Sequence, residues 1–253
     1  MELLNIKEYV KEEKEKLRRR GVAPSLSIVD ATDGDVGNQI YIKKKLEDFE
    51  EMGWKAKVVR PVDKKDLYYY LKWSIDTDAV IVQMPVADRF EFNIEDLPSF
   101  YDADGMTKGA LVMPATVRGI VDYLDACGFE YAGKNAVVMG RSEIVGKPMA
   151  KALTDRDMTV SLCHSKTDDW TKDYLLRNAD LVVCATGRPH SVFRAQCLNA
   201  FVVDVGISRI NGKIVGDFKE DSLGGSSTPV PGGVGLLTRL GLLKNCVDLK
   251  MGG

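Results

Sequence analysis

The chain has 253 residues, of which 45% are hydrophobic, and its 35 basic and 37 acidic side chains leave a formal net charge of −2. This length and composition predict a folded protein with room for two domains, and they exclude intrinsic disorder and a small disulfide-stabilised scaffold. With so little net charge, the chain as a whole is not expected to bind nucleic acid or an anionic membrane.

Short apolar runs, separated by helix-like stretches, follow one another along the chain. They cover residues 25–29, 56–59 and 79–82 in the first part, and 135–139, 159–163, 181–185 and 201–205 in the second. Their side chains are nearly all apolar rather than alternating, which is typical of parallel strands covered on both faces. This order predicts two α/β domains in tandem, joined near Met113 and Pro114.

A helix expected after the first strand carries Tyr41 and Lys45, which are four residues apart and project side by side. Open parallel sheets bind ligands at the carboxyl ends of their strands, close to the start of such a helix. Lys45 also ends a run of three lysines that is ordinarily a solvated face. By itself, therefore, the lysine is weak evidence for a catalytic site.

Two polar segments strengthen the case for Lys45. Gln83 interrupts a buried apolar run as its strand ends, and a buried amide needs partners, of which Lys45 is one candidate. An amine held by an amide in a partly desolvated cleft gives up a proton more readily than one in water. Asp102 and Asp104 follow in a turn, where they either shape the turn or bind the N–H groups of a heterocycle.

The strand at 135–139 runs into a glycine turn from Gly140 to Gly146, and a helix is predicted at 149–153. A strand, a glycine turn and a helix in this order can hold a pyrophosphate at the amino end of the helix. Ser142, however, occupies the place of the second glycine in the dinucleotide-binding fingerprint. A tight strand–helix connection without any ligand is an equally good interpretation.

The end of the next strand bears on which dinucleotide would bind. No acid stands at that end, whereas Ser165, Lys166 and Arg141 suit a 2′-phosphate, and this favours NADP over NAD. Asp168 and Asp169 lie just beyond, and a strand that ended later would bring a carboxylate into the position that favours NAD. His164, between these groups, is interpreted as a polar residue at the strand end rather than a catalytic one.

The five cysteines are odd in number, lie far apart and form no Cys-x-x-Cys pair. The first twenty residues are highly charged and do not resemble a signal peptide, and no segment is apolar over the roughly 18 residues of a membrane span. We therefore expect reduced thiols and a cytoplasmic location without membrane contact. With only two histidines, no metal site is expected.

Taken in order, these motifs resemble the bifunctional methylenetetrahydrofolate dehydrogenase and methenyltetrahydrofolate cyclohydrolase family over nearly the whole chain. In the first half the matching segments are Tyr41-Ile-Lys-Lys-Lys45, Val82-Gln-Met-Pro85 and Asp102-Ala-Asp-Gly105. In the second half they are Gly140-Arg-Ser142, Val145-Gly-Lys-Pro148, Cys163-His-Ser165, Asp204-Val-Gly-Ile207 and Thr228-Pro-Val-Pro-Gly-Gly-Val-Gly235.

The resemblance implies two α/β domains with a cleft between them, the second a Rossmann-like doubly wound parallel sheet. Residues 1–113 would form the folate-binding catalytic domain, residues 114–235 the NADP-binding domain, and the C-terminal helix at 236–253 would pack back on the first domain. The implied activity is NADP-dependent oxidation of 5,10-methylenetetrahydrofolate to 5,10-methenyltetrahydrofolate, followed by hydrolysis to 10-formyltetrahydrofolate. A homodimer is implied as well.

By the same resemblance, Lys45 is the general base of the hydrolysis and Gln83 positions it, while Tyr41 stacks on the folate rings and Asp104 anchors the pterin N–H groups. Further substrate contacts are implied for Val82, Met84, Pro231, Gly232, Gly233 and Val234. Cofactor contacts are implied for Gly140, Arg141, Ser142, Ser165, Ile207 and Thr116.

The chain departs from the family pattern at three places. Pro114-Ala-Thr-Val117 replaces a Pro-Cys-Thr-Pro segment, Val86-Ala-Asp88 replaces a Leu-Pro continuation with a following His, and the loop between Gly105 and Pro114 is shorter. A dehydrogenase with weak or no cyclohydrolase activity is thus one alternative, and a non-catalytic NADP-binding module is another. The presence of Lys45, Gln83 and Asp104 together disfavours both, because neither has a use for a general base.

Overall fold

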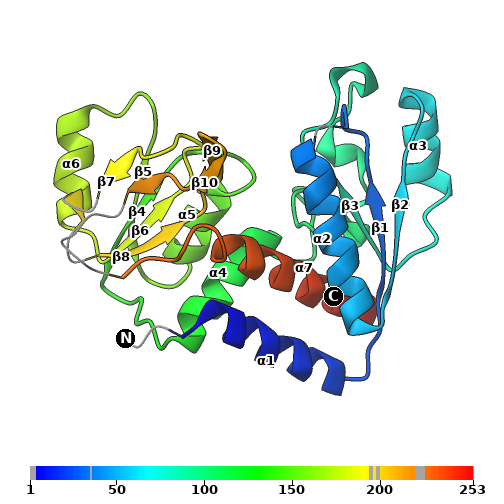
Figure 1. Ribbon diagram of the computed structural model, residues 1–253, viewed down its shortest axis with the longest axis horizontal. Coiled ribbons are helices and arrows are strands. Elements are labelled where there is room, and N and C mark those ends of the chain that lie inside the picture. The colour runs from blue at the N-terminus through cyan, green and yellow to red at the C-terminus, as the bar shows by residue number, and fades with distance from the viewer. Residues whose placement is uncertain (1–3, 35, 194–195, 198–199, 220–225, 253) are drawn as a thin grey trace. The chain divides into compact units, whose positions relative to one another are not determined.

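The computed structural model describes residues 4–34, 36–193, 196–197, 200–219 and 226–252. The chain groups into two compact units (Figure 1), which we name after their central strands. The β1 unit comprises Lys11–Ala115 and Arg239–Gly253, and the β4 unit comprises Met1–Val10 and Thr116–Thr238. Helices α1 (Ile6–Arg19) and α7 (Val234–Met251) contribute residues to both units.

The β1 unit is built on a parallel sheet of three strands in the order β2-β1-β3 (Figure 1). The strands are β1 (Ser25–Val29), β2 (Lys55–Val59) and β3 (Ala79–Val82). The helices are α2 (Val36–Met52) and α3 (Lys64–Trp73), followed by three single 3₁₀ turns, η1 (Asp88–Phe90), η2 (Ile94–Asp96) and η3 (Ser99–Tyr101). On one face of the sheet, Val29, Val80 and Val82 pack in a buried cluster with Leu67 and Leu71 of α3.

The β4 unit contains a parallel sheet of four strands in the order β5-β4-β6-β8 (Figure 1). The strands are β4 (Asn135–Met139), β5 (Thr159–Cys163), β6 (Leu181–Cys184) and β8 (Phe201–Asp204), and the helices are α4 (Ala115–Ala126), α5 (Gly146–Thr154) and α6 (Asp169–Arg177). After β4 the chain adds β5 on one side and β6 on the other. The carboxyl end of β4 is therefore the switch point at which doubly wound sheets bind ligands.

Four short strands accompany the larger sheet. Parallel β7 (Val192–Phe193) and β11 (Phe218–Lys219) form one pair, and antiparallel β9 (Ser208–Ile210) and β10 (Lys213–Val215) form the other. The amino-terminal residues belong to this unit because the Tyr123 hydroxyl donates to the carbonyl of Leu4 at 2.8 Å, and Tyr9 meets the Tyr123 ring edge-on.

The predicted α/β class, with parallel sheets and a Rossmann-like second sheet, is confirmed. Strands β1, β3, β4 and β5 have the predicted bounds, whereas β6 and β8 each end one residue earlier than expected. Helix α5 begins at Gly146, three residues before the predicted start, because the glycine turn leads directly into the first helical turn. In the described part of the chain, no helix has the length and apolar character needed to cross a membrane.

Candidate active site

Lys45 leaves the solvated face of its helix and lies among polar groups of the β1 unit. Its Nζ donates a hydrogen bond to Oε1 of Gln83 at 3.2 Å and lies 4.0 Å from Oδ2 of Asp104. The Lys45 side chain is only 11% exposed, whereas that of Lys43 is 76% exposed. Of the lysines in this run, Lys45 is thus the one enclosed by an amide and a carboxylate.

Gln83 fixes which atom faces the lysine. Its side-chain N–H₂ group donates to the carbonyl of Met84 at 3.1 Å and toward Oδ1 of Asn38 at 3.4 Å, so its oxygen must point to Lys45. The backbone N–H of Gln83 donates to Val29, which ties the residue to the carboxyl end of β1. Sequence reasoning missed Asn38, although it lies two helical turns before Lys45 on α2 and so shares its face.

The two aspartates of the predicted turn have different tasks. Asp102 is buried, and its carboxylate accepts backbone N–H bonds from residues 105–107 at 2.6–3.0 Å, which closes the turn. Asp104 instead faces Lys45, with its side chain 20% exposed. Burial raises the pKa of the Asp104 carboxyl, the Lys45 charge opposes this rise, and the negative charge of Asp102 adds to it. Asp104 is therefore the carboxylate available to a ligand.

Helix α7 supports the Asp104 turn by hydrogen bonds to the backbone on either side of it. The fully buried Asn245 donates to the carbonyls of Ala103 at 2.8 Å and Met113 at 2.9 Å, one on each side of the shortened loop. The neighbouring Cys246 thiol is also fully buried, and burial together with the charge of Asp104 raises its pKa. Sequence reasoning missed both residues; the available signal was a polar asparagine inside an apolar helical run.

The remaining predicted substrate residues are distributed over both units. Tyr41 stands one helical turn before Lys45 with 38% of its surface exposed, and partial burial of the ring raises the pKa of its hydroxyl. Val82 is buried in β3 and Met84 is half-buried. The predicted loop residues Pro231, Gly232 and Gly233 precede α7, which begins at Val234, and all four belong to the β4 unit.

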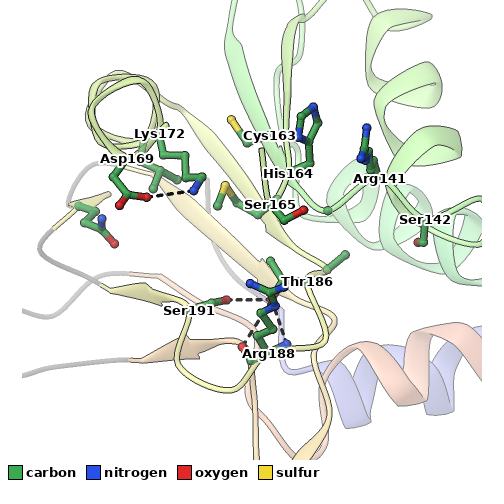
Figure 2. A pocket seen from close by; sticks show the side chains of 15 residues that line it. Arg141, Ser142, Cys163, His164, Ser165, Asp169, Lys172, Thr186, Arg188 and Ser191 are labelled. Atoms are coloured by element: carbon green, nitrogen blue, oxygen red, sulfur yellow. Dashed lines mark hydrogen bonds and ion pairs between the residues drawn. The ribbon is translucent and has the colours of Figure 1, made fainter. Parts of the chain in front are cut away.

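A cavity of about 450 Å³ lies in the β4 unit at the carboxyl ends of β4, β5 and β6 (Figure 2). The residues that line it include Gly140, Arg141, Ser142, Cys163, His164, Ser165, Asp169, Lys172, Thr186, Arg188 and Ser191. Figure 2 shows that these side chains come from three walls: the glycine turn, the β5–α6 segment and the loop after β6. The cavity thus occupies the switch point of the sheet.

The glycine turn lies tightly against the neighbouring strand. Gly140 has φ +122°, and a Cβ there would come 2.1 Å from the carbonyl oxygen of Ala185, so no larger residue fits. A Cβ on Gly146 would meet the Gly140 carbonyl oxygen at the same distance. The Ser142 hydroxyl accepts N–H bonds from Val145 at 3.2 Å and Gly146 at 3.3 Å. The cavity therefore adjoins the amino end of α5, where an anion is favoured.

Positive charge is concentrated at the cavity. Neither Arg141 nor Arg188 forms an ion pair with another described residue, whereas Lys172 pairs with Asp169 at 3.0 Å. Strand β5 ends at Cys163, and the Asp168 carboxylate is engaged as the cap of α6, where it accepts the N–H of Thr171 at 2.9 Å. The strand end itself therefore carries no acid, although Asp169 reaches the cavity wall.

His164 takes the structural role that the sequence favoured. Its ring Nδ1 accepts the backbone N–H of Lys166 at 3.1 Å, and the backbone N–H of His164 donates to the Thr167 hydroxyl at 3.0 Å. The ring proton consequently resides on Nε2. The imidazole shapes the turn after β5 and has no carboxylate partner in the described part of the chain.

The structure brings four of the six predicted cofactor residues, Gly140, Arg141, Ser142 and Ser165, to one cavity. Thr116 on α4 instead accepts a hydrogen bond from Thr238 at 3.2 Å, and Ile207 is an exposed residue after β8; neither lines the cavity. Sequence reasoning missed the wall formed by Thr186, Arg188 and Ser191. A polar Thr-Gly-Arg segment directly after a third strand of the same sheet was the signal for it.

These residues suit a phosphorylated dinucleotide on chemical grounds: around one cavity they offer a helix amino end, hydroxyl groups and two guanidinium groups that form no ion pair within the described ranges. No group of three or more His, Cys, Asp or Glu side chains that could hold a metal ion occurs among the described residues. The two polar sites are therefore an amine–amide–carboxylate cluster in the β1 unit and an anion-binding cavity in the β4 unit.

Comparison with known proteins gives concordant results. Residues 114–251 match the family model described as tetrahydrofolate dehydrogenase/cyclohydrolase, NAD(P)-binding domain. The bifunctional protein FolD 2 of Lactobacillus johnsonii is 35% identical, with 96% of this chain and 93% of that protein covered. A crystal structure of the bifunctional enzyme FolD from Campylobacter jejuni is similar with a TM-score of 0.82 and 32% identity, covering 97% of this chain and 94% of that one. For the bifunctional dehydrogenase/cyclohydrolase from Thermoplasma acidophilum, the TM-score is 0.86 at 28% identity, with coverages of 99% and 98%.

Proposed function

The chain belongs to the bifunctional tetrahydrofolate dehydrogenase/cyclohydrolase family, and from this membership we propose how its own residues carry out the two reactions. The enzyme oxidises 5,10-methylenetetrahydrofolate with NADP to 5,10-methenyltetrahydrofolate, and it hydrolyses that product to 10-formyltetrahydrofolate. The observation that carries the proposal is the cluster of Lys45, Gln83 and Asp104, in which an enclosed amine stands between an amide oxygen and a partly exposed carboxylate.

The oxidation requires positioning rather than acid or base catalysis. The carbon that loses hydride lies between two nitrogens, which share the positive charge that develops, so no strong acid is needed. NADP, when bound, supplies the hydride acceptor. We assign Arg141, Ser142 and Ser165 to holding it, with Arg141 as the partner of the 2′-phosphate. Two observations support this assignment: the Arg141 guanidinium forms no ion pair with any residue that the structure describes, and no acid stands at the end of β5.

The hydrolysis requires a water molecule to lose protons as it adds to the methenyl carbon. In our proposal the neutral form of the Lys45 amine accepts the first proton while the water oxygen bonds to the carbon. The carbonyl then forms as the hydroxyl loses the second proton of the water and the bond from that carbon to the pterin nitrogen breaks. The pterin nitrogen gains one proton in exchange for the broken bond, and the formyl group stays on the other nitrogen. One proton is released overall. The Gln83 oxygen, 3.2 Å from Nζ, keeps the amine directed into the site.

Folate binding is assigned to the groups around this amine. We propose that the Asp104 carboxylate accepts the pterin N–H groups and that the Tyr41 ring stacks on the folate. Support for Asp104 comes from its side-chain exposure and from Asp102, which satisfies the turn on its own. Support for Tyr41 comes from its half-exposed ring one turn before Lys45 on α2.

Replacing Lys45 with methionine tests whether this lysine serves the hydrolysis and not the oxidation. Methionine keeps most of the volume but cannot accept a proton, so we expect methenyltetrahydrofolate hydrolysis to fall by at least about 100-fold while the oxidation persists. Both rates are followed spectrophotometrically. Lys43→Met is the matched control, because that lysine is exposed and pairs with the exposed Glu47 at 3.7 Å. Hydrolysis by Lys45→Met at the wild-type rate would refute the assignment.

Replacing Arg141 with alanine tests the 2′-phosphate contact. Hydrogen bonds to charged groups contribute about 1.5–3 kcal/mol, so we expect the KM for NADP to rise roughly 10- to 100-fold and the KM for NAD to change little. Steady-state kinetics with both nucleotides measure this. Lys151→Ala, which removes an exposed cation from α5, is the control. A parallel loss with both nucleotides would assign Arg141 to the pyrophosphate instead.

We further propose that the enzyme acts as a homodimer in the cytoplasm. The dimer rests on the resemblance to the family. The cytoplasmic location is supported by the cysteines, all five of which are buried and form no disulfide in the described part of the chain.

A further inference from the structure

One wall of the nucleotide cavity is a loop, and a single buried carboxylate holds it. The loop follows β6, and its residues Thr186, Arg188 and Ser191 line the cavity (Figure 2). Oδ2 of Asp217 accepts three hydrogen bonds from it: from the Thr186 N–H at 2.5 Å, the Thr186 hydroxyl at 2.8 Å and the Gly187 N–H at 2.9 Å. Asp217 itself is absent from the cavity wall.

The surroundings of Asp217 fix its carboxylate in place. The residue is fully buried, and its backbone N–H donates to Oδ1 of Asp204 at 3.1 Å. A Cβ on Gly206 would stand 2.2 Å from Oδ1 of Asp217, so the chain passes directly over this oxygen. The Asp217 carbonyl accepts the N–H of Val192 at 3.1 Å, at the far end of the same loop. Asp217 therefore contacts both ends of the loop and has little freedom to move.

The positions of the hydroxyl protons follow from these distances. Thr186 has one O–H proton, and Asp217 Oδ2 at 2.8 Å is a better acceptor than the carbonyl of Arg188 at 3.4 Å. Since that proton is used, Ser191 must be the donor in its 2.8 Å contact with the Thr186 oxygen, which also accepts the Arg188 N–H at 3.0 Å. One carboxylate thus orders Thr186 and, through it, the two other lining residues.

We propose that Asp217 is a positioning residue for the cofactor: it sets the affinity for NADP by holding the loop after β6, without touching the nucleotide. The inference rests on the proposed function of the cavity. A charged acceptor is needed because three donors from one loop converge on a single oxygen, and bonds to an ionised acceptor are about twice as strong as neutral ones. The hydrogen bonds that the structure describes around Asp217 involve none of Lys45, Gln83 and Asp104.

The two activities provide an internal control, because the hydrolysis needs no nucleotide. We expect Asp217→Ala to raise the Kd for NADP, measured by titration calorimetry on the full chain, by about 10- to 100-fold, as expected when binding groups are misplaced by roughly 1 Å. Asp217→Asn keeps the shape and one accepting oxygen, so its effect should be smaller. For both variants the KM for NADP should follow the Kd, while methenyltetrahydrofolate hydrolysis stays at the wild-type rate.

Asp155→Asn is the matched control, since it removes an exposed carboxylate from the same unit, paired with Lys151 at 2.5 Å, and should change neither measurement. An unaltered Kd in both Asp217 variants would overturn the proposal. Equal losses of NADP binding and hydrolysis would also overturn it, because they would indicate a general loss of folding. If Asp217→Ala does not fold, the graded effect of Asp217→Asn decides. Wild-type protein that hydrolyses its substrate but does not bind NADP would remove the cavity assignment and this inference together, whereas Lys45 would keep its role.

Discussion

At the level of a single residue, Asp104 shows that a group suited to binding the folate can lower the stability of the folded chain. Its carboxylate lies 4.0 Å from the Lys45 amine, close to the charge of Asp102, in a largely buried position. Burial raises its pKa, which means that ionising this group is harder in the folded chain than in the unfolded one. A neutral amide of the same shape would avoid that penalty, but it would also present N–H₂ donors to the pterin N–H groups.

We therefore expect Asp104→Asn to impair folate binding and yet to gain stability relative to wild type as the pH rises. Between the ordinary carboxyl pKa of 3.8 and the raised one, folded wild type keeps a proton that the unfolded chain has lost, so its stability falls with rising pH through that window. The variant lacks this titration. Urea unfolding at a series of values from about pH 4 to pH 8 measures the difference.

Asp76→Asn is the comparison of opposite sign. Lys57 bonds to the Asp76 carboxylate and lowers its pKa, so wild type gains stability from this pair as the pH rises. The variant lacks this gain and should become less stable relative to wild type. The effect is small because the pair is exposed. A pH-independent difference between Asp104→Asn and wild type would show that the Asp104 carboxyl titrates alike in the folded and unfolded chains.

At the level of elements, the sequence predicted the strands that local composition determines. It missed the strands that are placed by contacts between residues far apart in the chain. The apolar runs of β1 and β4 are buried on both faces, so composition alone located them. Strands β7 and β11 have two residues each, too few for any periodicity. Strand β11 is placed by the buried Asp204, whose carboxylate accepts the N–H groups of Asp217 and Phe218, and no local pattern reveals that contact.

The same distinction holds for the candidate sites. Lys45 and Gln83 were predictable as a pair because a polar side chain at the end of a buried strand needs a partner at the same sheet edge. The turn residues by themselves did not decide between Asp102 and Asp104 as the ligand-facing carboxylate, since both occupy one turn, and only the family resemblance favoured Asp104. Asn245 lies far along the chain from the carbonyls that it binds, so its role emerges only once α7 is packed.

At the scale of the whole molecule, each unit has its own parallel sheet and its own polar site, but the chain changes units inside helices. Residues 6–10 of α1 belong to the β4 unit and residues 11–19 to the β1 unit, and α7 is divided in the same way between Thr238 and Arg239. A helix unfolds cooperatively because its hydrogen bonds form a continuous ladder. Loss of one unit would therefore fray two helices that the other unit needs.

We expect the chain to unfold in a single calorimetric transition that NADP displaces as a whole. A ligand present at 100 times its Kd stabilises the folded state by about 2.7 kcal/mol, and each kcal/mol raises the Tm of a protein of this size by roughly 2–4 °C. Differential scanning calorimetry at saturating NADP should therefore show one peak shifted upward by about 5–10 °C. With Asp217→Ala at the same NADP concentration, the shift should shrink, because the ligand then binds more weakly. Two separate peaks, of which NADP moves only one, would mean that the shared helices do not couple the stabilities of the two units.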